Sequence, residues 1–289
     1  MSNIGTYGKN ILFNWAGFAA GVVVTLYVSR LVLLGLGEDR ASVWALIVGL
    51  VGTMGLVDFG LRPAFFRQVN ALIGRGERDR INEFASTVLT LFVGALVPLV
   101  AASAICGAFF GDIFPDVAPE FRAEAVSTLI VVALVLGVSM LATILDSILD
   151  CHERFDLRNV MTTVYHVARG VGAAWALHGG ASMTLLALSQ LGAAILWLTG
   201  SWIMVKGVVP DFKFSPRLMR KAALKELLAQ GIPLFFHGAS LRIIFYVDSF
   251  LIAWLVDYRM VVHYSYATQL VNQGGTLISL AGRVFVPRI

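Results

Sequence analysis

The sequence predicts an all-α polytopic membrane protein, and its composition and apolar runs support that prediction. Of the 289 residues, 58% are hydrophobic and 14% are charged, whereas about 25% of the residues in a soluble domain are charged. The mean hydropathy is +0.80. Apolar runs long enough to cross a bilayer, about 20 residues each, recur along the chain. An outer-membrane barrel is excluded, because its strands alternate apolar and polar residues over about ten positions.

Eight segments have the length and apolarity of a spanning helix. The first is expected to be retained, because its apolar run is too long for a signal peptide and lacks an Ala-x-Ala-like exit. The fifth and the eighth are the weakest, and the Asn-Gln-Gly-Gly run at 272–275 interrupts the eighth. The predicted spans are 11–36, 42–62, 84–110, 125–148, 159–177, 182–205, 231–256 and 262–286.

The charge of the loops predicts the orientation of the chain. The loops after spans two, four and six are strongly basic, whereas the other loops hold only Arg40, Arg122 and Arg259. By the positive-inside rule, the N-terminus and the basic loops are expected in the cytoplasm. The basic residues are Arg67, Arg75, Arg78, Arg80, Arg154, Arg158, Lys206, Lys213, Arg217, Arg220, Lys221 and Lys225. Because the basic residues fall mainly in particular loops, no nucleic-acid partner is expected, whereas membrane lipids are expected partners.

The stretch 215–230 differs from the spans, because leucines and alanines alternate there with basic residues at helical spacing. This pattern predicts an amphipathic helix along the cytoplasmic interface. Two interpretations stay open: a plain linker that contacts anionic lipids, or a mobile tether between two bundles.

A weak repeat follows this stretch. Charged and aromatic residues of spans one and two recur in spans seven and eight at an offset of about 218–224 residues. Parallel repeats of this kind are typical of transporters. We therefore expect a six-helix membrane lobe at 1–206, a cytoplasmic amphipathic linker at 207–230, and the first two helices of a second lobe at 231–289.

Four stretches resemble known sequences. The run 44–67 resembles the second span of polysaccharide and O-antigen flippases of the multidrug/oligosaccharidyl-lipid/polysaccharide exporter superfamily. Residues 150–159 after span four and 264–270 in span eight agree with it, and Phe285-Val286-Pro287 resembles the Pro-terminated end of that span. The resemblance is diffuse and extends through the whole chain.

The resemblance implies two six-helix lobes around a central cavity that opens alternately to each side. The implied cargo is a polyprenyl diphosphate-linked oligosaccharide, flipped across the bacterial inner membrane for polysaccharide, lipopolysaccharide or O-antigen biosynthesis. No bond would be made or broken, so no enzyme activity and no cofactor are expected, although a proton or sodium gradient could drive the step. Members usually have twelve or more spans, so the chain is expected to be an N-terminal portion or fragment.

Arginines inside the spans are the candidate diphosphate contacts. A charge at the bilayer centre costs about 2.5–3.5 kcal/mol even on the lenient insertion scale, so such residues normally face protein or a wet cavity. Arg242 has about twelve residues of span on either side, and the resemblance implies that span seven lines the cavity. A guanidinium offers paired donors that match phosphate oxygens. An internal ion pair is the alternative, although Asp248 lies six residues on, about 240° around the helix.

Arg30 and Arg62 are the assisting candidates for the diphosphate. Arg30 lies in the outer third of span one, from which it could instead reach the interface. Arg62 follows Asp58 by four residues, which favours a local salt bridge.

Three aspartates are candidates for ion coupling or for a gate: Asp58, Asp248 and Asp146. Asp58 could change partner between states, and Asp248 could carry a proton or neutralise Arg242 or Arg169. Asp146 precedes Asp150 by one turn at the cytoplasmic end of span four. A solvated helix end and an intracellular gate both fit that position.

Other function classes have weaker support. The cluster Asp150, His152, Glu153 and Asp156 has metal-ligand residue types, but its spacing fits no zinc or two-metal signature, so no metal is expected. Phosphate-loop and Rossmann glycine patterns are absent. A multi-span glycolipid synthase or polymerase remains the enzymatic alternative. A multidrug exporter of the same superfamily is the closer alternative, but it would favour acidic and aromatic cavity residues.

Overall fold

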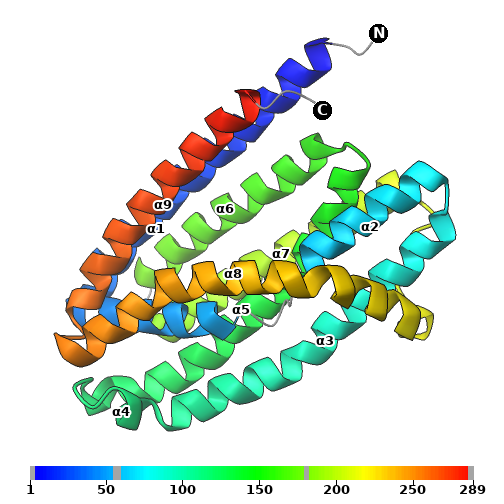
Figure 1. Cartoon of the computed structure of the whole chain (residues 1–289). Coiled ribbons are helices and arrows are strands. Elements are labelled where there is room, and N and C mark those ends of the chain that lie inside the picture. The colour runs from blue at the N-terminus through cyan, green and yellow to red at the C-terminus, as the bar shows by residue number, and fades with distance from the viewer. Residues whose placement is uncertain (1–3, 55–59, 179–181, 286–289) are drawn as a thin grey trace.

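The computed structural model describes residues 4–54, 60–178 and 182–285, and every regular element in those ranges is a helix (Figure 1). The predicted all-α fold is therefore confirmed. The helices are α1 (Ile4–Met54), α2 (Leu61–Arg75), α3 (Arg78–Ala108), α4 (Phe110–Ile113), α5 (Pro119–Cys151), α6 (Phe155–His178), α7 (Met183–Val208), a 3₁₀ turn (Pro216–Leu218), α8 (Lys221–Leu255) and α9 (Met260–Phe285).

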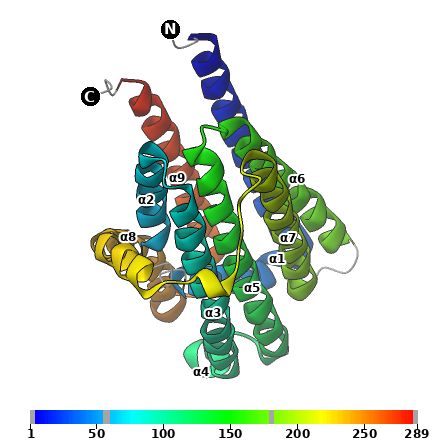
Figure 2. The same ribbon diagram turned by 90° about the vertical axis from the view of Figure 1, so that its right-hand side faces the viewer.

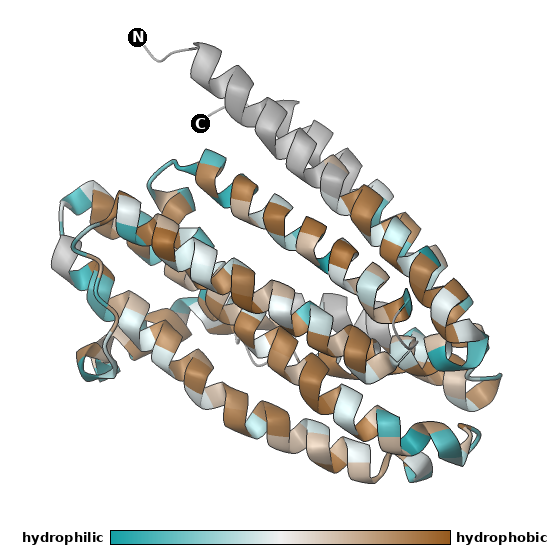
Figure 3. Ribbon diagram, turned by 180° about the vertical axis from the view of Figure 1, so that it is seen from behind, coloured by the Kyte–Doolittle hydropathy of each residue, from teal (hydrophilic) through white to brown (hydrophobic). Residues whose placement is uncertain are grey.

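Within the described ranges, four helical segments are long and apolar enough to cross a membrane. They are Gly21–Met54, Arg80–Ala108, Pro119–Cys151 and Met183–Val208. Apolar residues predominate along these helices, whereas polar residues gather in the connecting turns (Figure 3). The chain is therefore a multi-pass membrane protein.

The predicted span one lies in α1, and the predicted span two begins there; α1 breaks at Gly37 and ends at Met54. This glycine has φ 76° and ψ 170°, a conformation that residues with a Cβ rarely adopt. The loop expected after span two is in part wrong, because a separate helix, α2, begins after Gly60 and runs to Arg75. This segment is helical because Leu61, Phe65 and Val69 form a buried stripe at helical spacing.

The prediction for 215–230 needs correction. Helix α8 begins at Lys221 and continues through Pro233 into the predicted seventh span, so no separate interfacial helix precedes it. The segment 209–220 is attached to α3 by hydrogen bonds, which argues against a mobile tether. The pairs are Asn82 with Asp211 and Lys213, Ser86 with Lys213 and Ser215, and Thr87 with Arg220.

The break in α1 and the turns between helices gather at two ends of the molecule (Figure 1). The acidic end comprises residues 37–42, 109–124 and 256–263, and the basic end comprises residues 75–80, 152–158 and 206–221. Between them, α5 packs against α3 and α7, and α6 packs against α1 and α7. Helix α9 runs beside α1, and α8 runs beside α2 (Figures 1 and 2). The division of the chain into lobes at residue 206 stays a prediction.

Candidate functional site

A cavity of about 1040 Å³ lies where α1, α6 and α7 face α8 and α9. Helix α1 contributes residues on both sides of its break, and α9 contributes the longest stretch of the lining. Among the described residues that line the cavity, Arg169 alone is charged. The uncharged polar lining residues are Thr25, Ser29, Trp44, Gln190, Ser249, Ser265, Tyr266, Thr268, Gln269, Asn272 and Gln273.

Arg169 is held in place at the cavity wall by two neighbours. Its Nε donates a hydrogen bond to Oε1 of Gln190 at 2.6 Å, and Gln190 Nε2 donates back to the Arg169 carbonyl at 3.4 Å. Its guanidinium carbon lies 5.4 Å from the ring centroid of Tyr165, within the range of a cation–π contact. The terminal nitrogens of Arg169 make no hydrogen bond to any described residue. The paired donors of the guanidinium are therefore available to an anion in the cavity.

Two residues of α9 add to the cavity wall. The Ser29 hydroxyl donates to Gln269 Oε1 at 3.0 Å, which ties α1 to α9. The hydroxyl of Tyr266 is buried, and within the described residues it has no hydrogen-bond partner. Buried polar groups normally have a partner, so a ligand in the cavity is one way to satisfy this hydroxyl.

The predicted site residues are scattered relative to this cavity. Arg30 and Arg62 are exposed and are not among its lining residues. Asp248 is exposed and accepts a hydrogen bond from the Tyr264 hydroxyl at 2.5 Å. Asp58 and the side chain of Arg242 lie outside the described residues. The roles assigned to these residues stay predictions.

Asp146 lies inside the bundle, with only 3% of its surface exposed. The interpretation of this residue as a solvated helix end is therefore wrong. Trp197 Nε1 donates to its Oδ2 at 3.1 Å, and the Ser201 hydroxyl donates to its Oδ1 at 2.7 Å. The Trp197 ring stacks on Tyr165, with centroids 4.6 Å apart. Because Tyr165 also underlies Arg169, a continuous row of side chains joins the buried carboxylate to the cavity wall.

The candidate cluster after α5 is occupied by ion pairs. Asp150 pairs with Arg158 at 3.1 Å, and Asp156 pairs with Arg154 at 3.0 Å. The hydrogen bond from Arg154 lowers the pKa of Asp156 below its usual value. These pairs belong to the turn between α5 and α6, away from the cavity lining.

Contacts between two turns hold the acidic end together. Arg259 Nε lies 2.6 Å from Asp39 Oδ1, and the Tyr258 hydroxyl donates to the same oxygen at 3.3 Å. His263 Nε2 lies 3.1 Å from Glu38 Oε1, and the Ser42 hydroxyl donates to the Arg259 carbonyl. Burial raises the pKa of Tyr258, which favours its neutral, donating form. The break in α1 is thereby attached to the turn between α8 and α9.

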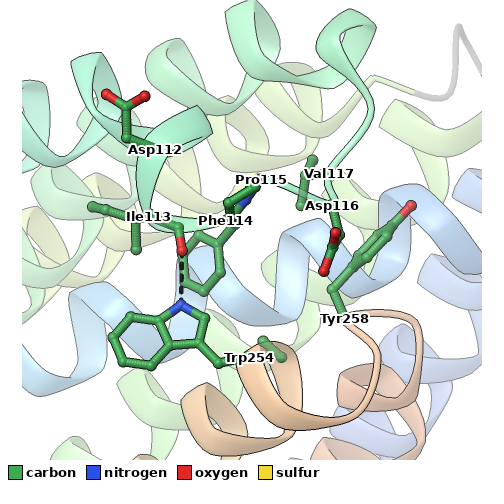
Figure 4. Close-up of a pocket in the computed structure, with 9 residues that line it drawn as sticks. Asp112, Ile113, Phe114, Pro115, Asp116, Val117, Trp254 and Tyr258 are labelled. Atoms are coloured by element: carbon green, nitrogen blue, oxygen red, sulfur yellow. Dashed lines mark hydrogen bonds between the residues drawn. The ribbon is translucent and has the colours of Figure 1, made fainter.

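A further contact at this end joins α8 to α4. Trp254 Nε1 donates to the Ile113 carbonyl at 2.7 Å, and both residues border a second cavity of about 430 Å³ (Figure 4). Tyr258, Val261 and Val262 are buried in the same apolar cluster as α1 and α5. The α8–α9 turn therefore packs against the preceding helices, and the acidic end of the molecule is closed.

Removal of the Asp39 carboxylate is expected to loosen this closure. Asp39→Ala takes away the acceptor that Arg259 and Tyr258 share, so hydrogen–deuterium exchange over 256–263 should become faster. The change in melting temperature should be small, because exposed ion pairs contribute little stability. Asp112→Ala is the control, since Asp112 is exposed at the same end and makes no side-chain bond to a described residue. Equal exchange in the two variants would contradict the expectation.

Comparison with protein families gives one match that covers most of the chain. A family model described as polysaccharide biosynthesis protein matches residues 43–289. No curated protein sequence gives a significant match.

Solved structures match over nearly the whole chain. One is described as the inward-facing conformation of a multidrug resistance MATE family transporter of the MOP superfamily; its TM-score is 0.69 at 16% identity, over 92% of this chain and 58% of that one. A MOP superfamily transporter from Pyrococcus furiosus has a TM-score of 0.62 at 17% identity, over 90% of this chain and 62% of that one. A MATE structure in complex with MaD3S has a TM-score of 0.64 at 16% identity, over 96% and 70%.

The chain thus spans 58% and 62% of the lengths of the first two structures. At identities of 16–17% these likenesses show the fold alone.

Proposed function

The chain belongs to the polysaccharide biosynthesis protein family, and we propose that it forms all or part of a transporter that flips a lipid-linked oligosaccharide across the membrane. Its fold is that of MOP-superfamily transporters. The observation that carries the proposal is the polar cavity with Arg169 at its wall. A polyprenyl diphosphate head would bind there while its tail stays in lipid.

The chemistry of the lining supports an anionic, glycosylated cargo. The guanidinium of Arg169 keeps its terminal N–H groups free of described partners, and paired N–H donors match phosphate oxygens. The amides of Gln269, Asn272 and Gln273 both donate and accept hydrogen bonds, as sugar hydroxyls require. A multidrug exporter for cationic drugs would gain from acidic lining residues. No described residue that lines the cavity is acidic, so the flippase is the better-supported alternative.

The proposed mechanism is alternating access in a bacterial inner membrane, with the basic end in the cytoplasm. With the acidic end closed, the diphosphate head would enter from the basic end and contact Arg169. Separation of the Asp39–Arg259 and Glu38–His263 pairs would then open the acidic end. Arg242, Arg30 and Arg62 remain proposed as further contacts along the path. No covalent bond changes in these steps.

Deletion of the gene in the organism that encodes this chain tests the proposal. We expect loss of a surface polysaccharide, together with accumulation of its lipid-linked precursor on the cytoplasmic leaflet. Loss of the precursor itself would indicate a synthase, and unchanged surface polysaccharide would contradict a role in export. Complementation with the protein that carries this chain is the control.

A further inference from the structure

We propose that Asp146 is a proton-binding site whose occupancy is linked, through Trp197 and Tyr165, to Arg169 at the cavity. The proposal rests on the proposed function for the nature of the cavity ligand, but the proton site itself does not depend on the cargo. It begins from the position of one carboxyl group inside the bundle.

The environment of Asp146 disfavours a permanent negative charge. The side chain is almost fully buried, and both hydrogen-bond donors, Trp197 and Ser201, are neutral. No cation of a described residue lies within ion-pair distance of this carboxylate. Arg158 and Asp150 act on Asp146 through their opposite charges, but a buried carboxylate whose hydrogen-bond donors are both neutral still costs several kcal/mol. Uptake of a proton removes that charge, so the carboxylate and the neutral acid are both accessible states.

The donor set favours a proton over a sodium ion. A cation site needs several oxygen ligands, and an indole N–H cannot serve as one. Here Trp197 Nε1 is directed at Oδ2 of Asp146, at 3.1 Å. The position that a cation would take on that oxygen is therefore filled by a hydrogen-bond donor.

The surrounding charged groups offer a route for the proton to the basic end. On α5, Asp150 lies one turn after Asp146, and on α6 Arg158 pairs with Asp150. Arg62 of α2 also acts on Asp150 through its charge. His166 of α6 is the other titratable group near the row, beside Tyr165. Water-accessible charged groups therefore lie within about one helical turn of Asp146. They are the half-buried Asp150, its partner Arg158 and the exposed Arg62.

The link to the cavity follows from the hydrogen bond of Trp197. A bond to a carboxylate is roughly twice as strong as one to a neutral acceptor. Protonation of Asp146 therefore weakens its hydrogen bond to the indole of Trp197. That indole stacks on Tyr165, and Tyr165 contacts Arg169. Protonation also removes a negative charge from the lobe, which favours an anion at Arg169. By linkage, a bound diphosphate would in turn favour the protonated state of Asp146.

Infrared spectroscopy of the purified protein tests the proton site directly. A protonated carboxylic acid has a carbonyl stretch that disappears on deprotonation. As the pH is raised, we expect one such band to disappear in the wild type, and we expect it to be absent throughout in Asp146→Asn. Asp211→Asn, at an exposed position of the 209–220 segment, should retain the band. A wild-type spectrum with no titrating band that Asp146→Asn removes would overturn the proposal.

Binding of farnesyl diphosphate by the same proteins tests the link to Arg169. The diphosphate itself titrates, but it does so equally for every variant, so the difference between variants carries the result. We expect Asp146→Asn to bind about fivefold more tightly than wild type at pH 8, and equally at pH 5. Trp197→Phe should reduce the pH dependence, whereas His166→Gln should retain it.

Three results would contradict the link. If the affinity for farnesyl diphosphate depends on pH equally in wild type and Asp146→Asn, while the infrared band is present, the link is contradicted and the proton site is not. Loss of the pH dependence in His166→Gln assigns it to the histidine instead. A cavity that binds no probe at any pH contradicts the proposed function together with the link, while the infrared band still reports on Asp146.

Discussion

Replacement of Arg169 by Ala is expected to weaken farnesyl diphosphate binding by about 10- to 100-fold. The variant removes charge-assisted hydrogen bonds that contribute about 1.5–3 kcal/mol. It also leaves the buried amide of Gln190 without its donor. Arg169→Lys should recover part of the affinity, because it keeps the charge but lacks the planar pair of donors. Isothermal titration calorimetry in detergent measures the effect.

Two other arginines provide comparisons for this measurement. Arg217→Ala, at an exposed site on the basic end, is expected to bind like wild type and controls for net charge. Arg30→Ala tests the role predicted from the sequence, because Arg30 is exposed outside the cavity lining. Wild-type affinity in Arg169→Ala, or an equal loss in Arg217→Ala, would contradict the assignment of Arg169.

Replacement of Gly60 by Ala is expected to destabilise the protein by about 3 kcal/mol or more. Gly60 has φ 67°, a left-handed conformation that is unfavourable for Ala. A Cβ there would lie 2.3 Å from the Gly231 carbonyl oxygen and 2.9 Å from the Phe235 amide nitrogen. Both atoms belong to the backbone of α8, so a side-chain rotation cannot relieve the clash. Helices α2 and α8 would have to separate.

Gly74→Ala is the matched control for this substitution. Gly74 lies in α2, the helix that Gly60 precedes as its N-cap, and a Cβ at Gly74 meets no atom within 4 Å. Helix propensity predicts that Ala at this position is neutral or stabilising by up to about 1 kcal/mol. Thermal unfolding in detergent should therefore give a much lower melting temperature for Gly60→Ala than for Gly74→Ala. Equal melting temperatures would show that α2 and α8 do not meet closely at Gly60.

Much of the fold follows from apolar periodicity, because a bilayer demands long continuous helices. The departures arise where tertiary contacts decide. Helix α2 occupies part of the loop expected after span two, because its stripe of Leu61, Phe65 and Val69 packs inside the molecule. The 209–220 segment lies on α3 because Ser86 and Thr87 are buried there and bond its backbone. The hydropathy of the sequence alone predicts neither of these contacts.

The site was harder to predict than the fold. The sequence shows that Arg169 lies within a span, as do Arg242 and Arg30, but a single sequence does not show which way each side chain faces. The polar residues that share the cavity with Arg169 on other helices carry that information. Gln190 in the predicted sixth span and Tyr266 in the eighth were available signals, because an amide and a hydroxyl in apolar helices normally have partners. Only the packing of the helices places Gln190 against Arg169 and Tyr266 in the same cavity lining.

Translocation of a lipid-linked sugar by the purified protein that carries this chain tests the central claim most directly. In proteoliposomes, a fluorescent polyprenyl diphosphate sugar can be quenched only while it is exposed in the outer leaflet. We expect the wild type to accelerate exchange between the leaflets, and Arg169→Ala to reduce that rate towards the rate of empty liposomes. Exchange no faster than in empty liposomes, or equally fast in wild type and Arg169→Ala, would contradict the account.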